Sequence, residues 1–507
     1  MKGALLVCGT HSDAGKSVLT AGICRWLWRQ GVSVAPFKAQ NMALNSVVTL
    51  DGGEIGRAQA MQAAAAGVEP EAAMNPVLLK PSGERRSQVV VMGRPRAEAD
   101  ARSYRELKRD LAPVVAGALA ELRSRFDVVV CEGAGSPAEV NLREDDLANM
   151  GLARAAGLPV LIVADIDRGG AFASLLGTLA LLDPTDQAHV AGFALNKFRG
   201  DEALLEPALA ELREATGRPL LGVLPWLDLP RLDAEDSLAL ANVEVPASGG
   251  GEVLDVAVVR LRWISNFTDF DALAAEPGLR LTYTRSPLDV ERADLAILPG
   301  TKATVEDLGA LRRWGLDRAL RHRAEAGRPL LGICGGYQML GERISDRVES
   351  GQGETEGLGL LPVATEFREE KLLRRRSGGC PWLGSDAGGY EIRHGRVSRH
   401  GGEPLLRDES GEREGCRAGS VLGTSWHGLL EHDDLRRALL GWVAQERGIR
   451  FHPGSEPFAA LREARLDALG DLVAENLDTG RLAELIQTGP PPDLPTVHTE
   501  VSACLPS

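Results

Sequence analysis

"LLGICGGYQML", residues 330–340, places one cysteine between a short apolar run and a pair of glycines. The run 330–333 suits a buried strand, and Gly335 and Gly336 allow a tight turn into a following helix. Such an elbow exposes the Cys334 sulfur and aims helix amides at it, an environment that suits a nucleophile. The alternative is a buried core cysteine, the usual place for a lone cysteine in an apolar run. The stretch predicts an α/β fold and marks Cys334 as a candidate nucleophile.

A thiol nucleophile needs a base, and the sequence offers one downstream. "GTSWHGLLEHD" contains His427, bounded by turn residues, which makes it a candidate general base and acid. The stretch "ILPGTKA" ends a predicted strand with Gly300 and Thr301. Their backbone amides, together with that of Gly335, are candidate donors to the oxyanion of a tetrahedral intermediate.

Short apolar runs alternate with helix-like segments along most of the chain. Four runs in the first half end in small or polar residues: "GALLVCGT", "DVVVCEGAGS", "PVLIVADID" and "VAGFALNKF". Helices are expected between them at 16–30, 106–125 and 203–216. A second series follows with "VLDVAVVRL", "LRLTYTR", "ADLAILPGT" and "RPLLGICGG". This pattern predicts doubly wound α/β domains, in which ligands bind at the carboxyl ends of the strands.

Changes in composition divide the chain into segments. Stretches rich in Pro, Gly and acids indicate a linker, and an amphipathic pattern followed by a Pro-rich end indicates a helix and a tail. The predicted division is a first domain at 1–230, a linker at 231–252, a second domain at 253–450, a helical extension at 451–485 and a disordered tail at 486–507.

Two charged stretches of the second domain, 366–376 and 407–417, are predicted to be solvated loops. A run of charges is more often a solvated face than a site. We likewise expect His394 and His432 to be surface residues.

The first apolar run ends in a glycine-rich loop, "GTHSDAGKS", which opens the helix expected at 16–30. Its backbone amides suit phosphate oxygens, Lys16 would reach the terminal phosphates, and Ser17 would ligate Mg²⁺. The usual spacing is G-x4-G-K-[ST], whereas here the first glycine lies one residue too early. The alternative is an ordinary turn. The predicted ATP-binding loop comprises Gly9, Thr10, Asp13, Ala14, Gly15, Lys16 and Ser17.

Two later strand ends support a nucleotide site. "VVVCEGAGS" ends in Glu132, a carboxylate that could complete the Mg²⁺ shell with Ser17. "ALNKF" ends in Asn196, an amide that could read the edge of a base. The alternatives are a solvated acid at a strand end and a turn-forming asparagine.

Bulk properties exclude several classes of function. The 507 residues allow two domains, and 44% hydrophobic with 25% charged residues is ordinary for a globular protein. A net charge of −14 argues against a nucleic-acid partner, and no apolar stretch approaches the roughly 20 residues of a membrane span. The 7 cysteines are far apart, without a CxxC pair, which predicts a reducing, cytoplasmic location.

Longer motifs resemble a known family. The elbow "GICGGYQMLG" resembles the glutaminase domain of triad glutamine amidotransferases, and the N-terminal loop resembles that of dethiobiotin synthetase-like ATP-dependent ligases. A chain with this loop first and this elbow second is similar to the cobyrinate amidating enzymes, and the resemblance extends over roughly residues 1–475. The resemblance is carried by "PFKAQNMALNS" (36–46), "EIGRAQAMQAAAAGVEPEAAMNPVLLKP" (54–81), "EGAGSPAEVNL" (132–142), "ADIDRGGAFAS" (164–174), "NKFRGD" (196–201), "SNFTDFDAL" (265–273) and "GYEIRHG" (389–395).

The resemblance implies a fold and adds site residues. It implies an N-terminal doubly wound P-loop-type domain and a C-terminal flavodoxin-like glutamine amidotransferase domain. It also brings Lys38 to the ATP site, a residue that would otherwise be regarded as a surface lysine. Many amidotransferases carry an acid two residues after the histidine, where this chain has Leu429. What orients His427 is left open, with Glu431 a weak candidate.

The resemblance also implies an activity. It is a carbon–nitrogen ligase reaction, in which ATP, Mg²⁺ and L-glutamine as ammonia donor amidate the b, d, e and g carboxylates of adenosylcobyrinic acid a,c-diamide in cobalamin biosynthesis. The partner is thus a corrinoid small molecule, with a homo-oligomer left open. The alternatives are the enzyme that makes the a,c-diamide, an amidotransferase for a cell-wall carboxylate and a P-loop partitioning-type ATPase.

Overall fold

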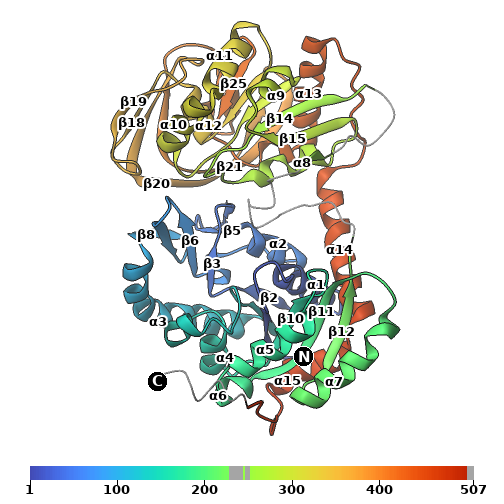
Figure 1. Cartoon of the computed structure of the whole chain (residues 1–507). Helices are drawn as coiled ribbons and strands as arrows, with labels where there is room; N and C mark the ends of the chain where they lie inside the picture. Colours follow the sequence, from blue (N-terminus) through green and yellow to red (C-terminus); the bar gives the residue numbers. More distant parts are fainter. Residues whose placement is uncertain (228–243, 246–251, 499–507) are drawn as a thin grey trace.

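The computed structural model describes residues 1–227, 244–245 and 252–498, which form two lobes (Figure 1). Each lobe is built around a mainly parallel sheet, the first within residues 3–225 and the second chiefly within 254–424. Most of the predicted linker 231–252 lies outside the described residues. The predicted α/β class with parallel sheets is confirmed.

The sheet of the first lobe is six-stranded and wholly parallel. Its order is β12 (Leu220–Pro225), β11 (Val190–Phe198), β10 (Val160–Asp165), β1 (Gly3–Gly9), β9 (Val128–Glu132) and β2 (Val34–Phe37). Leu5 and Val7 of β1 enter one core whereas Leu6 and Cys8 enter another, because successive strand residues face opposite sides. The helices of this part of the lobe are α1 (Lys16–Arg29), α3 (Ala101–Arg125), α4 (Met150–Ala156), α5 (Ala171–Leu181), α6 (Pro184–Gln187) and α7 (Glu206–Thr216).

A smaller part of the first lobe, residues 40–99, faces the second lobe (Figure 1). Its four-stranded sheet has the order β3 (Gln40–Met42), β6 (Val77–Pro81), β7 (Ser87–Val91) and β8 (Arg94–Ala99). Beside it lie the pair β4 (Ser46–Val48) and β5 (Glu54–Gly56) and the helix α2 (Arg57–Ala65). This part carries most of the motif at 36–46 and all of that at 54–81, so two of the stretches that carry the family resemblance lie toward the second lobe.

The second lobe has a seven-stranded sheet with five parallel central strands. Its order is β13 (Glu244–Val245), β15 (Leu279–Thr284), β14 (Leu254–Val259), β16 (Leu295–Leu298), β17 (Leu330–Ile333), β25 (Val421–Thr424) and β24 (Cys416–Ala418). Its helices are α8 (Asp271–Ala274), α9 (Pro287–Arg292), α10 (Thr304–Trp314), α11 (Leu316–Glu325), α12 (Gly335–Leu340) and α13 (Asp433–Arg447).

The two charged stretches are mainly strands, so the expectation of solvated loops is wrong. Residues 366–376 lie within β20 (Val363–Cys380), which pairs with β21 (Ser385–Arg399), and 407–417 contribute to short strands of the same lobe. The remaining strands of this region are β18 (Arg343–Asp346), β19 (Gly353–Glu356), β22 (Leu406–Asp408) and β23 (Arg413–Glu414). The charges of β20 have partners across the boundary between the lobes: Lys371 binds Glu54, and Arg375 binds Glu69.

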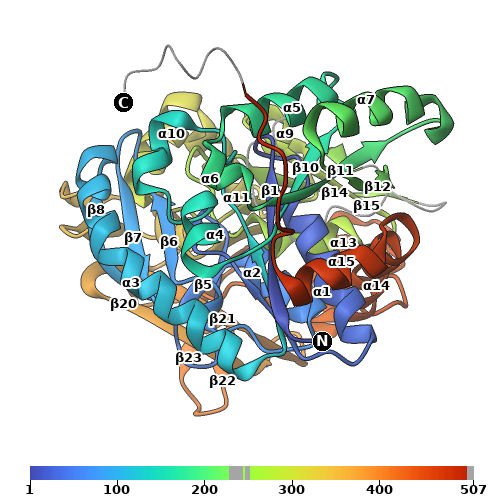
Figure 2. The same ribbon diagram turned by 90° about the horizontal axis from the view of Figure 1, so that it is seen from below.

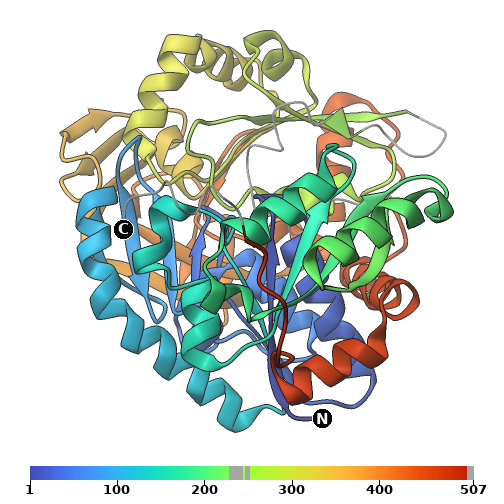
Figure 3. The same cartoon turned by 60° about the horizontal axis from the view of Figure 1, so that its bottom comes forward.

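The C-terminal helices return to the first lobe. Helix α14 (Phe458–Asn476) packs on α1 and α15 (Thr479–Thr488) lies beside β1, as Figures 2 and 3 show from two directions. Arg25 of α1, 5% exposed, pairs with Glu463 and Asp467 of α14. These helices supply apolar side chains to one core of the first sheet. The predicted helical extension is therefore a structural part of the first lobe.

The predicted tail 486–507 is described only up to residue 498. Its described part contacts the first lobe: the Val497 backbone amide donates to Gln187 Oε1 at 2.8 Å, and the Pro495 carbonyl accepts from Arg218. Among the residues that the structure describes, no helix is both long and apolar enough to cross a membrane.

Candidate active sites

Cys334 lies at the turn between β17 and α12. Its backbone has φ 51° and ψ −108°, a conformation that L-residues rarely adopt and that is held by surrounding contacts. A Cβ on Gly336 would lie 1.9 Å from the Leu298 carbonyl oxygen, so glycine is required for the turn to pack on β16. The Cys334 side chain is only 6% exposed, yet it lines a pocket. The sulfur is therefore buried among core residues on one side and open to a pocket on the other.

His427, which follows β25, reaches Cys334 and is held by a carboxylate from another segment. The two side chains line the same pocket, and Cys334 is among the groups that raise the pKa of His427. Its Nδ1 lies 2.7 Å from Asp269 Oδ2, and the Gly428 backbone amide donates to Asp269 Oδ1 at 2.8 Å. Because Asp269 engages Nδ1, Nε2 is the nitrogen that faces the sulfur. The arrangement is a sulfur–imidazole–carboxylate triad.

The electrostatics of the triad favour a protonated imidazole. Burial lowers the pKa of His427, but Asp269 and Cys334 outweigh burial and raise this pKa to about 10. The imidazole is thus protonated at neutral pH and places a positive charge beside the sulfur. The ring of Tyr390 stacks on His427 with centroids 5.6 Å apart, and the two backbones exchange hydrogen bonds of 2.8 and 3.0 Å.

The three predicted oxyanion residues lie together at this site. A Cβ on Gly335 would lie 3.0 Å from the Thr301 backbone nitrogen, and a Cβ on Gly300 would lie 2.8 Å from His427 Cε1. Small residues here let the imidazole, the cysteine turn and the end of β16 meet. The geometry is compatible with backbone amides that stabilise a tetrahedral oxyanion.

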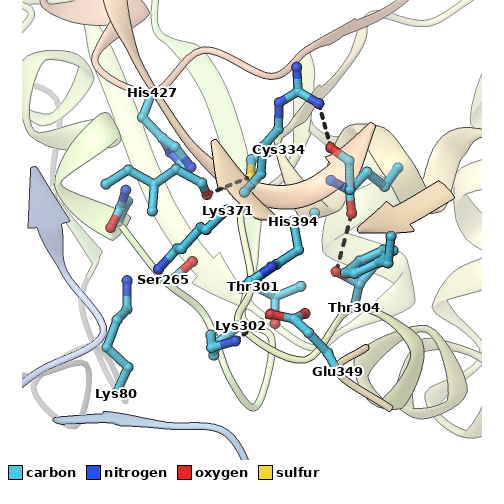
Figure 4. A pocket seen from close by; sticks show the side chains of 17 residues that line it. Lys80, Ser265, Thr301, Lys302, Thr304, Cys334, Glu349, Lys371, His394 and His427 are labelled. Atoms are coloured by element: carbon cyan, nitrogen blue, oxygen red, sulfur yellow. Dashed lines mark hydrogen bonds and ion pairs between the residues drawn. The ribbon is translucent and has the colours of Figure 1, made fainter. Parts of the chain in front are cut away.

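The pocket at Cys334 is lined by both lobes (Figure 4). Lys80 comes from β6 of the first lobe, whereas Lys302, Glu349 and Lys371 come from the second. Lys80 and Lys371 share the buried carboxylate of Glu54, each at 2.5 Å. Burial lowers the pKa of Lys371 to about 8, with Glu54 opposing this shift. The first lobe thus closes the pocket with charged side chains that pair with those of the second.

His394 is buried and lines the same pocket, so the expectation of a surface residue is wrong. Its Nδ1 donates to the Arg368 carbonyl at 3.0 Å, and its Nε2 lies 3.4 Å from Gln88 Nε2 of the first lobe. Burial lowers its pKa, which favours the neutral ring. The error has a physical reason, because Gln88 of the first lobe lies against the ring, a contact that the sequence around His394 does not reveal. His432 is exposed, as expected.

The glycine-rich loop follows β1 and opens α1 as predicted. Gly15 has φ 105°, and a Cβ there would lie 1.9 Å from Asn196 Nδ2, so glycine is required. Asn196 Nδ2 donates to the Ala14 carbonyl at 3.0 Å and thereby supports the loop. Lys16 Nζ donates to the His11 carbonyl at 2.9 Å. Asp13 is exposed, and its carbonyl accepts from Lys197 Nζ at 2.9 Å.

Glu132 is the centre of a buried polar cluster beside the loop. Ser17 Oγ and Lys38 Nζ donate to its Oε1 at 2.8 and 2.9 Å, and Gln62 Nε2 donates to its Oε2. Burial raises the pKa of Glu132, but Lys38 and the hydrogen bonds outweigh burial and lower it. The carboxylate is therefore ionised. Lys38, expected at the surface without the resemblance, is only 4% exposed.

This cluster fits a magnesium ion bound together with phosphates. The Ser17 hydroxyl and the Glu132 carboxylate are hard oxygen ligands at one place, and phosphate oxygens and waters normally complete such a shell. The part of the chain that the structure describes has no cluster of three or more His, Cys, Asp or Glu side chains suited to a metal.

Sequence reasoning missed the carboxylate that orients His427. Glu431, the weak candidate, instead pairs with Arg57 and Arg462. Asp269 lies in the stretch "SNFTDFDAL", which was noted for its resemblance but given no role. It is 158 residues before His427, so no local spacing could connect the two.

Two family models together match most of the chain. A model described as "CobQ/CobB/MinD/ParA nucleotide binding domain" matches residues 5–239, and one described as "CobB/CobQ-like glutamine amidotransferase domain" matches 255–435. Proteins named cobyric acid synthase are similar over nearly their full length. That of Frankia casuarinae is 60% identical over 98% of this chain and 99% of its own. Those of Streptomyces avermitilis and Rhodococcus jostii are each 56% identical over 98% of this chain, and over 99% and 98% of their own.

The fold, the triad and these matches define a class: glutamine amidotransferase ligases in which a nucleotide-binding domain precedes a glutaminase domain. Within that class, the chain belongs to the cobyric acid synthase family. The family resemblance noted in the sequence is therefore confirmed.

Proposed function

We propose that this protein amidates the b, d, e and g carboxylates of adenosylcobyrinic acid a,c-diamide, with ATP and glutamine as co-substrates. The observation that carries the proposal is one chain with two sites of complementary chemistry. A nucleotide loop lies beside the Lys38–Glu132 pair, and a Cys334–His427–Asp269 triad lies in the other lobe. The names of the relatives support the corrinoid as the substrate.

The first site prepares the carboxylate. A carboxylate does not react with ammonia, because oxide is a poor leaving group. In our proposal a substrate carboxylate oxygen attacks the γ-phosphorus of ATP, ADP departs, and an acyl phosphate forms. Lys16 and the loop amides neutralise the transferred group, and Lys38 lies where it can neutralise both carboxylate and phosphate. A bound Mg²⁺, held by Ser17 and Glu132, would supply further charge neutralisation.

The second site supplies ammonia. The Cys334 thiolate attacks the side-chain amide carbon of glutamine, and His427 donates its proton to the departing nitrogen. Water then hydrolyses the γ-glutamyl thioester to glutamate and restores the thiolate. Ammonia displaces phosphate from the acyl phosphate, which gives the amide.

The proposed cellular compartment of the reaction follows from its co-substrates. ATP and glutamine are cytoplasmic metabolites, and the six described cysteines are all free, which supports a cytoplasmic enzyme. The proposed partner is a small corrinoid.

The mass spectrum of the corrinoid product tests the proposal. Incubation of the a,c-diamide with ATP, Mg²⁺ and glutamine should give four successive exchanges of a carboxyl OH for NH₂. Consumption of cobyrinic acid in preference to its a,c-diamide would instead indicate the enzyme of the earlier step. ATP hydrolysis that is independent of both corrinoid and glutamine would contradict the ligase assignment.

A further inference from the structure

Helix α2 lies between the two sites, at the face of the first lobe that meets the second (Figure 1). Its first residue, Arg57, is 6% exposed and reaches into the second lobe. Arg57 Nη2 donates to Glu431 Oε1 at 2.7 Å, and the Arg57 side chain hydrogen-bonds to Tyr390. Tyr390 is the residue whose ring stacks on His427. One end of α2 therefore binds the tyrosine whose ring stacks on the histidine of the triad.

The backbone at the same end of α2 reaches the triad by a second route. The Arg57 amide donates to the Asn45 carbonyl at 3.1 Å, and Asn45 Oδ1 accepts the Phe267 amide at 3.0 Å. Phe267 begins the 3₁₀ turn that contains Asp269, the carboxylate bound to His427. The side chain of Asn45 is 1% exposed. The first lobe thus fixes both the stacking partner and the hydrogen-bond partner of His427.

The later part of α2 contacts the nucleotide site. Gln62 is fully buried, and its Nε2 donates to Glu132 Oε2 and to the Ser17 carbonyl, the latter at 3.4 Å. Gln62 lies five positions after Arg57, which corresponds to roughly 7.5 Å along the helix axis. A short helix with tightly packed side chains moves as a unit, because interiors are close-packed.

We propose that α2 couples the two sites, with Arg57 and Gln62 as positioning residues, so that nucleotide binding changes the reactivity of Cys334. The inference rests on the proposed function, because it requires that Glu132 serves the nucleotide site. Its physical basis is a change of partners at Glu132. Both oxygens of this carboxylate accept hydrogen bonds, from Lys38 and Ser17 on one and Gln62 on the other.

Ligation of a metal by Glu132 takes a lone pair that these donors now share, so at least one donor must shift. A shift of Gln62 displaces α2 and, through Arg57, the Tyr390 and Asp269 contacts of His427. The two sites are then linked by differential contacts, which is the requirement for a coupling free energy. The useful direction is activation, because ammonia released before an acyl phosphate exists is lost.

The test measures alkylation of Cys334 by iodoacetamide, with and without Mg²⁺ and the non-hydrolysable analogue AMP-PNP, in the absence of glutamine and corrinoid. In the wild-type protein, the nucleotide should raise the alkylation rate at least about fivefold. Arg57→Met and Gln62→Ala should reduce this increase to less than about twofold. Arg375→Met should keep it, because the hydrogen bonds of Arg375 to the first lobe go to the Val48 carbonyl and Glu69, which lie outside α2.

Two outcomes would overturn the coupling. One is a wild-type protein in which AMP-PNP does not change the rate of Cys334 alkylation. The other is an Arg57→Met variant in which AMP-PNP raises this rate as much as in the wild type. If Gln62→Ala fails to bind AMP-PNP by calorimetry, Arg57→Met decides, because Arg57 lies at the other end of α2 and binds Glu431 of the second lobe. Failure of the proposed function is distinguishable, because it appears in the corrinoid mass spectrum of the wild-type protein.

Discussion

The glutaminase site and the nucleotide site differ in what their charged groups contact. At the glutaminase site, Asp269 binds His427, and His427 lies beside the Cys334 sulfur. Cys334 itself has a strained backbone conformation. At the nucleotide site, Glu132 accepts from three donors of the same cluster, and Lys16 contacts a loop carbonyl. The first arrangement suits covalent catalysis, in which a protein atom forms a bond. The second suits charge neutralisation, in which protein groups position phosphate and carboxylate without bonding to them.

The largest effect is expected when the bonding atom itself is removed. Cys334→Ala should lower glutamine-dependent synthesis by about ten-thousand-fold, because no other group can form the thioester. Synthesis from added ammonium salt should remain within about threefold of wild type, since the nucleotide site is untouched. The measurement is the rate of corrinoid amidation with each nitrogen source.

Cys380→Ala is the matched control for this variant. Cys380 is a buried cysteine of the same lobe at the end of β20, and it does not line the pocket at Cys334. The Cys380→Ala variant should retain both glutamine-dependent and ammonia-dependent synthesis. Equal loss of glutamine- and ammonia-dependent synthesis in Cys334→Ala would count against two separable sites.

Loss of a neutralising charge should have a smaller but broader effect. Lys16→Ala should slow amidation by about a thousandfold, because a fixed charge near the transferred phosphoryl group is lost. Both nitrogen sources should be affected equally, whereas glutamine hydrolysis at Cys334 should persist. Lys2→Ala, at an exposed residue before β1, serves as control. Retained ammonia-dependent synthesis in Lys16→Ala would refute the assignment of the loop.

Local patterns predicted much of the fold and part of each site. The strand ends at Gly9, Glu132 and Cys334 could be found because a buried strand, a glycine turn and a helix follow one another within a few residues. Contacts between segments that are distant in the sequence could not be predicted from local patterns. Asp269 meets His427 only through the tertiary fold, and α14 returns to a core made by β1. Charges in β20 were misread because a charged strand at the boundary between the lobes and a solvated loop have the same composition.

The smallest predicted effect concerns this missed carboxylate. Asp269→Asn should lower glutaminase kcat by about a hundredfold, the low end of what a positioned general acid contributes, because an amide can still hold the ring but cannot stabilise its charge. The pH dependence is the sharper readout. With the pKa of His427 raised to about 10, the imidazolium persists below that pH and activity falls as pH rises through it. Without the Asp269 charge, burial lowers the pKa of His427, so the alkaline limb of kcat/KM should move down by at least about one pH unit.

Glu431→Gln separates this role from that of the other nearby acid. Glu431 contacts Arg57 and Arg462 rather than the imidazole, so its substitution should leave the alkaline limb in place. If Glu431→Gln moves the limb and Asp269→Asn does not, Asp269 is not the residue that holds the proton on His427. The comparison between the sites would then change as well, because the glutaminase site would depend on a carboxylate that is itself held by the first lobe.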